Sequence, residues 1–410
     1  MRGIVLNGGK MRKLKIFITG VGLLLIICSQ GFCEMKVAPY YYLYTSESVF
    51  FADTYTTLST NIYGDFAVKM VFNDRWSLLG LYELNYQGPG ATSESKEGAN
   101  FQEQYQDHSV ILKPSYLLSE KWTLGGRVGY ALQLSKTGST ESWNKGLYNY
   151  YGWMLGFEGK TKIKNIELKP GYLFTQNLYP NYSNLIGYYD KKEARPEQDH
   201  YRHKFYADAS FPISKTLSVN AGLNDTIKAY AAQGIIGESG VEDTSVKQVD
   251  NVAGVELNLS YLPLKGLSIA LNQKLEANFS NQNDFTLSPT NPSDTTTTQF
   301  NQNYYSYTFY EISPGITYTF SNNLSLSFSC TWNIKNYHAR PARDSKGFWL
   351  SEIEYDVIRQ LDAGVSLPMG KFSLGINYTY VNAVSNMGYA QYYRYNYTSH
   401  NAKLSYSFEY

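Results

Sequence analysis

Hydrophobic and polar residues alternate at every second position through most of the chain after residue 34. In the segment that follows Asn323, apolar residues take one face, and serine, threonine and asparagine residues take the other. The apolar face consists of Leu324, Leu326, Phe328, Cys330, Trp332 and Ile334. The same alternation recurs in segments that begin at Trp122, Phe205, Leu267 and Phe372. A period of two predicts β-strands whose two faces lie in different surroundings.

Short polar turns join these strands into hairpins. Seven turns are expected, at 73–75, 119–121, 162–165, 214–215, 263–266, 321–323 and 368–371. The hairpins supply fourteen strands, and one further strand is expected on either side of them, near 36–44 and near 393–410. The even total of sixteen puts both ends of the sheet on the side of the short turns. That side is periplasmic in bacterial outer-membrane barrels.

Long polar segments connect one hairpin to the next. They are expected as extracellular loops at 46–60, 87–104, 135–147, 177–199, 229–247, 280–302, 337–352 and 382–392. A soluble sandwich of two sheets would also alternate. Repeated strands of about 9–11 residues, with short turns at one end and long loops at the other, favour a membrane barrel. The expected fold is therefore all-β: a transmembrane antiparallel up-and-down β-barrel of about sixteen strands.

Aromatic residues gather beside the short turns. An amphipathic ring is stable at headgroup depth, so these residues are expected to form a periplasmic girdle. They are Phe72, Trp76, Trp122, Phe211, Tyr261, Phe320, Phe372 and Tyr410. The total of 39 tyrosines is also typical of a chain that crosses membrane interfaces many times.

The N-terminal segment has the pattern of a secretory signal peptide. An apolar run at 16–27 follows the basic residues Arg12, Lys13 and Lys15. The run is short for a membrane anchor and ends before small residues, which predicts a signal peptide within residues 1–33. Translation is expected to start at Met11, because the residues before it do not contribute to this pattern. Residues 34–410 are then a single barrel domain, in which Cys330 is the only thiol. A framework of intrachain disulfides is therefore excluded.

The net charge of +1, from 36 basic and 35 acidic residues, gives no basis for nucleic-acid binding. The expected location is the bacterial outer membrane, with outer-membrane lipid as the surrounding partner. The sequence is compatible with a homo-oligomer. It gives no reason to expect a cofactor.

The end of the chain carries the most specific motif. Leu404, Tyr406, Phe408 and Tyr410 share one face, and polar residues take the alternate positions. This strand resembles the C-terminal β-signal of bacterial outer-membrane proteins, in which a terminal aromatic residue follows alternating apolar positions. The resemblance covers this strand alone and implies recognition by the barrel assembly machinery. A free strand edge whose side chains are read at every second position is suited to β-augmentation.

Charged residues are expected on the inner face, because an Arg or Lys that faces lipid at mid-depth costs about 2–4 kcal/mol. The residues predicted to line a pore are Lys69, Lys113, Arg127, Arg202, Lys204, Asp208, Lys274, Glu276, Glu354, Asp356 and Asp362. We call Glu354, Asp356 and Asp362 the acidic strip; it is expected to face Arg202 and Lys204 and to attract cations. Structural ion pairs are the alternative. Arg359 shares the parity of the apolar, outward residues of its segment, where a charged side chain is not expected. Either a bulge shifts the register or the side chain lies above the hydrocarbon.

Signals for an enzyme are weak. Each of the five histidines lies near a strand end, and no active-site motif accompanies them. His200 and His203 lie close to Asp199, but their spacing on a strand divides them between the two faces, so no metal site and no catalytic residues are predicted.

A wide barrel without a visible plug favours a porin-like channel for the passive passage of small hydrophilic solutes. The strand number is similar to that of general trimeric porins, whose third loop folds inward. Here that loop is short, so 177–199 or 280–302 is the expected substitute for the constriction. Two alternatives remain open: a surface-binding or assembly barrel that acts through its loops, and, less favoured, a hydrolase with a loop site.

Overall fold

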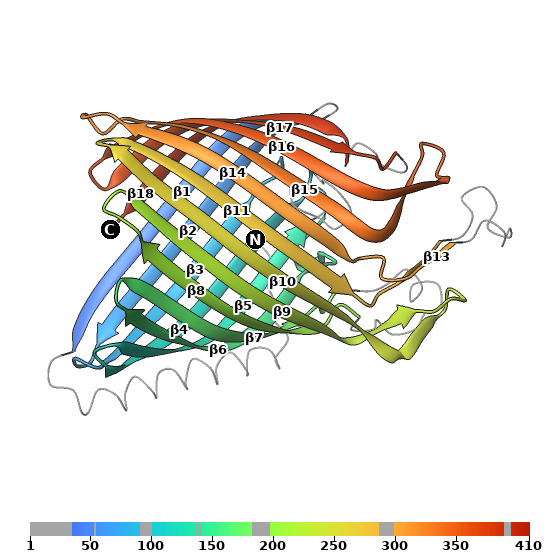
Figure 1. Cartoon of the computed structure of the whole chain (residues 1–410), viewed down its shortest axis with the longest axis horizontal. Helices are drawn as coiled ribbons and strands as arrows, with labels where there is room; N and C mark the ends of the chain where they lie inside the picture. The colour runs from blue at the N-terminus through green and yellow to red at the C-terminus, as the bar shows by residue number, and fades with distance from the viewer. Residues whose placement is uncertain are drawn as a thin grey trace.

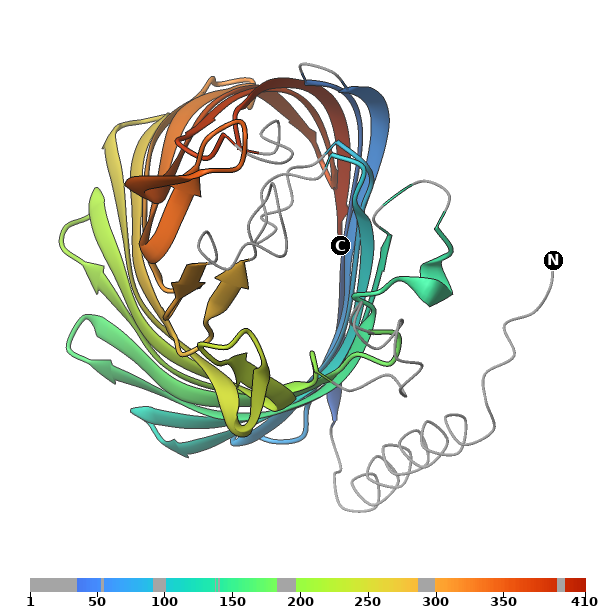
Figure 2. The same ribbon diagram turned by 90° about the vertical axis from the view of Figure 1, so that its right-hand side faces the viewer.

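The computed structural model describes residues 35–52, 55–90, 101–136, 138, 141–182, 197–286, 299–388 and 395–410. In these residues, sixteen antiparallel strands form one closed barrel (Figure 1). Figure 2 shows the barrel from one end, as an oval ring. Its strands are β1 Lys36–Ala52, β2 Tyr55–Val71, β3 Trp76–Gln87, β4 Gln104–Ser119, β5 Trp122–Lys136, β6 Tyr150–Ile163, β7 Ile166–Leu178, β8 His200–Pro212, β9 Leu217–Ile236, β10 Glu242–Leu264, β11 Leu267–Ser280, β14 Tyr307–Thr319, β15 Ser325–Arg343, β16 Trp349–Met369, β17 Phe372–Ser385 and β18 Tyr397–Glu409. A separate hairpin pairs β12 Asp284–Thr286 with β13 Gln299–Asn301, and η1 Trp143–Lys145 is a short 3-10 helix.

The first and last strands close the ring by pairing with each other. Their register runs from Tyr42 opposite Glu409 to Ala52 opposite Ser399. Tyr41 and Tyr410 also exchange two backbone hydrogen bonds, of 3.1 and 2.9 Å. This closure leaves no free edge in the barrel and confirms the predicted fold and strand number.

All seven short turns lie where the sequence predicts them. In the first, the Asn73 side-chain oxygen accepts hydrogen bonds from the backbone N–H groups of Arg75 and Trp76, at 2.9 and 2.8 Å. Gly266 and Gly370, with φ of 85° and 68°, occupy turn positions in the left-handed region that glycine enters without a steric cost.

The strands continue further towards the long loops than the sequence predicts. The segments 46–52 and 55–60, expected as loop, belong to β1 and β2, and much of 229–247 belongs to β9 and β10. Similarly, 337–343 belongs to β15 and 349–352 to β16, while 280–302 contains the β12–β13 hairpin. These expectations were wrong because a ladder outside the membrane needs no apolar face, so hydrophobic alternation does not reveal it. Short ends of the other predicted loops, such as 135–136 and 382–385, are strand for the same reason.

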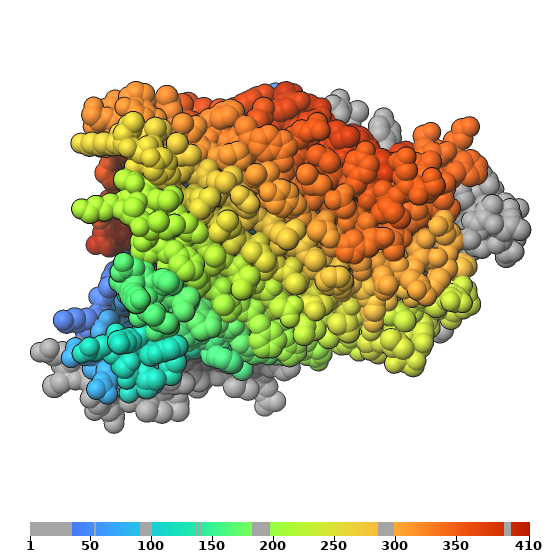
Figure 3. Space-filling model, in the orientation of Figure 1, coloured from blue at the N-terminus to red at the C-terminus, as the bar shows by residue number. Residues whose placement is uncertain are grey.

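The outward face is apolar, as predicted. Leu326, Phe328 and Trp332 of β15 are 37–49% exposed, and outward residues of the other strands behave alike. Figure 3 shows this wall as a continuous surface. Of the eight residues predicted to form the periplasmic girdle, six are exposed near the short turns and two, Phe72 and Phe211, are partly buried. The exposed ones are Trp76, Trp122, Tyr261, Phe320, Phe372 and Tyr410. Tyrosines also mark the upper part of the wall, where Tyr130 packs edge-on against Trp153 at 4.9 Å.

No helix in the described part of the chain is long and apolar enough to span a membrane. The thiol of Cys330 is free.

Candidate pore

The eleven residues predicted to line a pore all have the inward parity of their strands. On β8, for example, Arg202, Lys204 and Asp208 alternate with the exposed Tyr201 and Phe205. Directly paired residues on neighbouring strands lie on the same face of the sheet, so the inward face can be followed from strand to strand. For example, Lys169 of β7 lies opposite Asp208, and Glu276 of β11 lies opposite Gly254 of β10. The structure therefore places these side chains on the lumenal wall.

Several of these charges form ion pairs along the wall. The Lys274 ammonium lies 3.0 Å from a Glu276 carboxylate oxygen. Glu167, another inward residue, lies 3.0 Å from both Lys160 and Lys169. Part of the lumenal charge is thus neutralised locally, which reduces the net electrostatic field inside the barrel.

A cluster of cationic groups lies on β8 and β9. Arg202 pairs directly with Lys228 of β9, and Lys204 follows on the same face. The Arg202 Nε donates to His200 Nε2 at 3.1 Å, and the Lys228 ammonium lies 4.3 Å from the centre of the Tyr230 ring. Lys228 was missed from the sequence because it stands at the border of a segment expected as loop. Its even number, shared with the other inward residues of β9, is the signal that could have found it.

The acidic strip lies on β16, six strand positions from β8 around the ring. Asp356 is paired with Lys335 of β15, and Asp362 accepts hydrogen bonds from Thr379 and Gln360, at 2.6 and 2.8 Å. Glu354 is fully buried, and its Oε2 lies 2.7 Å from the Arg340 Nε. Glu354 is therefore not an open wall charge. Sequence parity could not reveal its partner, because a register shift between Asn336 and Pro341 brings Arg340 inside.

Aromatic rings enclose Arg340 at the extracellular mouth. The guanidinium carbon lies 5.0 Å from the ring centre of Tyr304, in the connection after β13, and 4.8 Å from that of Tyr337 on β15. Burial raises the pKa of Tyr304. The pair of Arg340 and Glu354 thus fastens the connection after β13 to the inner wall.

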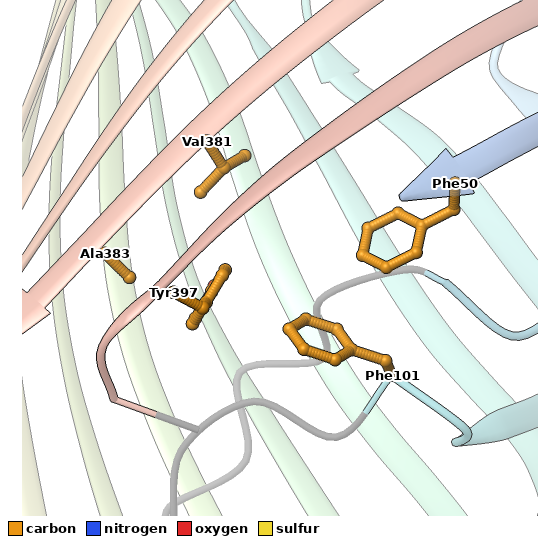
Figure 4. Packing of buried hydrophobic residues seen from close by; sticks show 5 residues of the cluster. All are labelled: Phe50, Phe101, Val381, Ala383 and Tyr397. Carbon is orange, nitrogen blue, oxygen red and sulfur yellow. The ribbon is translucent and has the colours of Figure 1, made fainter. Parts of the chain in front are cut away.

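A hydrophobic cluster occupies another part of the mouth (Figure 4). It consists of Phe50 of β1, Phe101, Val381 and Ala383 of β17, and Tyr397 of β18. Phe101 precedes β4 and is 8% exposed; its ring centre lies 5.2 Å from that of Phe50 and 5.1 Å from that of Tyr397. Because Phe50 and Tyr397 have the inward parity, Phe101, just before β4, packs on the inner side of the barrel wall.

The expected constriction by 177–199 or 280–302 falls largely on residues 183–196 and 287–298, outside the described part of the chain. Within 280–302, the β12–β13 hairpin lies inside the outline of the ring in Figure 2. At the other candidate, Asp199 accepts a hydrogen bond of 2.7 Å from the Tyr179 backbone. Burial raises the pKa of Asp199, and it raises the pKa of Tyr179 to about 12.

The histidines that the sequence places near serine or aspartate are divided between the two faces of their strands. His108 and Ser109 are adjacent in sequence but point to opposite faces of β4, and Ser109 donates to Glu83 at 2.6 Å. His200 faces inward and His203 outward. In the described residues, no group of three His, Cys, Asp or Glu side chains could hold a metal ion.

Arg359 faces outward, paired with Trp332 in an unshifted register, so no bulge explains it. Its side chain is exposed and lies 3.5 Å from the Asn382 side-chain oxygen. Ten residues separate it from the periplasmic end of β16. This position is consistent with the alternative that Arg359 lies near the upper border of the hydrocarbon.

No protein-family model and no curated protein matches the chain. Among solved structures, OmpT of Vibrio cholerae, an outer membrane protein in trimer form, is 12% identical, with a TM-score of 0.48 and coverage of 92% of this chain and 99% of that one. An anion-selective porin from Comamonas acidovorans is 8% identical, with a TM-score of 0.48 and coverage of 92% and 100%. Acinetobacter baumannii OccAB3 is 10% identical, with a TM-score of 0.46 and coverage of 91% and 99%. Similarity at this level says nothing about solute or activity. The closed ring of strands, the apolar outer wall and its aromatic borders make this chain an outer-membrane β-barrel protein of a bacterium, porin-like in architecture.

Proposed function

We propose that the protein is a channel for the passive passage of small hydrophilic solutes across the outer membrane. The observation that carries the proposal is the division of charge between the two faces of the wall. All eleven predicted pore-lining residues have the inward parity, whereas the outward face of the spanning segments is predominantly apolar. Ionised groups on the inside of a membrane protein require water, and a barrel of sixteen strands is too wide for side chains alone to fill.

Recordings from planar bilayers test this proposal. The protein purified from outer membranes should produce stepwise, ohmic increases in current when it is added to one chamber. Heat-denatured protein from the same preparation is the control and should give no steps. Folded protein that inserts into the bilayer without any conductance would contradict the proposal.

A surface-binding barrel is the second candidate, because two hairpins extend far beyond a membrane-length strand. The strands β10 and β16 have 23 and 21 residues, and their extracellular ends project at the right of Figure 1. A variant with the hairpin tip 237–241 replaced by a short turn distinguishes the two candidates. A channel keeps its conductance in this variant, whereas a surface receptor loses its ligand.

A further inference from the structure

Three outward-facing histidines repeat one arrangement on separate parts of the barrel. In each, the imidazole Nδ1 is hydrogen bonded to a tyrosine hydroxyl on the preceding strand: Tyr82 to His108 at 2.9 Å, Tyr172 to His203 at 2.8 Å and Tyr378 to His400 at 2.6 Å. The residues directly opposite these histidines are Leu84, Phe174 and Tyr380. The bonded tyrosine is therefore always two residues closer to the periplasm. We call these three units the His–Tyr pairs.

The His–Tyr pairs lie at the upper border of the apolar wall. His108 stands eleven residues before the periplasmic end of β4, and His203 and His400 stand nine residues before the ends of β8 and β18. A strand tilted by about 40° gains roughly 2.5 Å of height per residue, so all three rings lie about 22–27 Å above the short turns. The apolar band of an outer-membrane barrel is about 25 Å tall. The rings are thus at the level of the outer leaflet's headgroups.

The hydrogen bond to tyrosine orients each ring. A phenol hydroxyl is a better donor than acceptor, so it donates to Nδ1, and the neutral imidazole then carries its proton on Nε2. Nδ1 is turned towards the periplasm, where the tyrosine lies, so Nε2 on the far side of the ring is directed towards the extracellular end. Neighbouring rings hold this orientation, with ring centres at 5.2 Å for His203 and Phe174 and at 5.2 Å for His400 and Tyr380.

We propose that the His–Tyr pairs bind the phosphate groups of outer-leaflet lipids. Each pair presents an oriented Nε2–H donor at the depth where lipid phosphates lie, and a phosphate oxygen is the strongest acceptor at that depth. His108 and His400 contribute most. Beside His203, the outward Asp225 on β9 is directly opposite Phe205 and places a carboxylate next to the site. That charge repels an anionic headgroup.

His338 provides a matched control on the same outer wall. Its Nε2 is already bound to the Thr308 hydroxyl at 2.8 Å, and its ring centre lies 6.2 Å from that of Phe279. His338 stands thirteen residues beyond the periplasmic end of β15, above the level of the His–Tyr pairs, so replacing it by Phe removes an exposed outward imidazole that lies too high to reach the lipid phosphates. Replacing the three paired histidines by Phe keeps an aromatic ring at each position and removes all three donors.

Electron spin resonance of spin-labelled lipids in vesicles that contain the full-length protein tests the proposal. The measured quantity is the association constant of phosphatidic acid relative to diacylglycerol, which carries no phosphate. We expect it to fall about twofold for H108F and for H400F, less for H203F, and at least fourfold for the triple variant. The H338F protein should match the wild type. An unchanged ratio in a correctly folded triple variant, with folding checked by circular dichroism, would overturn the proposal.

Two further arms test the orientation of the imidazoles and the source of the phosphate. The variant with Tyr82, Tyr172 and Tyr378 all replaced by Phe keeps the imidazoles but loses the bond that orients them, so part of the selectivity should be lost. Full selectivity in this variant would refute the oriented geometry. Inorganic phosphate at millimolar concentration should leave the lipid ratio unchanged at constant ionic strength. Displacement of the lipid by inorganic phosphate would instead indicate a general anion site and overturn the assignment to lipid.

Discussion

Removal of Arg340 should strongly destabilise the packing of the extracellular mouth. Arg340 and Glu354 are 4% and 0% exposed in their side chains, and their charged atoms lie 2.7 Å apart. An R340M substitution leaves the Glu354 carboxylate buried without this partner. Loss of one member of a buried ion pair costs about 3–5 kcal/mol. E354Q should cost less, because Arg340 keeps its contacts with Tyr304 and Tyr337, each worth about 0.5–2 kcal/mol.

A double-mutant cycle measures this coupling. Guanidinium unfolding of the reconstituted protein, followed by tryptophan fluorescence, gives the free energy of unfolding for the wild type, R340M, E354M and the double variant. The double variant should be close to the wild type, because apolar side chains of similar volume replace a buried pair at little cost. Hydrogen exchange at 299–306 should increase in R340M and in the double variant but not in E354M, since only E354M keeps the Arg340 that contacts Tyr304. A cost below about 1 kcal/mol for R340M, or a double variant as unstable as R340M, would refute the reasoning.

Three other changes test the pore and its assembly. Neutralising the acidic strip by E354Q, D356N and D362N should move the reversal potential in a salt gradient towards anion selectivity, mainly through Asp356 and Asp362, and an unchanged potential would argue that these groups are purely structural. F101A removes a buried ring at a cost of about 3–5 kcal/mol to the local packing, so single-channel records should show larger current fluctuations than the wild type, whereas identical records would show that this anchor does not affect the pore. Deletion of Tyr410 should lower the amount of folded protein in the outer membrane, measured against the conservative variant Y410F, and equal amounts for both variants would contradict a role in assembly.

The alternation of side chains determined the barrel, because a strand with lipid on one side and water on the other must change polarity at every second residue. For that reason the seven turns, the closure of the sheet and the inward parity of residues such as Arg202 and Asp362 could be read from the sequence. The same physical argument does not apply to strand residues outside the membrane. Beyond it both faces of a strand meet water, so the upper parts of β1, β9 and β16 carried no signal and were expected to be loop.

Only the tertiary structure determined which residues form the buried ion pair and the hydrophobic cluster at the extracellular mouth. Arg340 reaches Glu354 because a bulge in β15 changes its face, and periodicity cannot predict a bulge. Phe101 is separated from Phe50 and Tyr397 by long stretches of chain, and their contact exists because β1 and β18 meet when the barrel closes. The His–Tyr pairs likewise depend on the register between neighbouring strands, in which a shift by one residue would turn each imidazole to the other face.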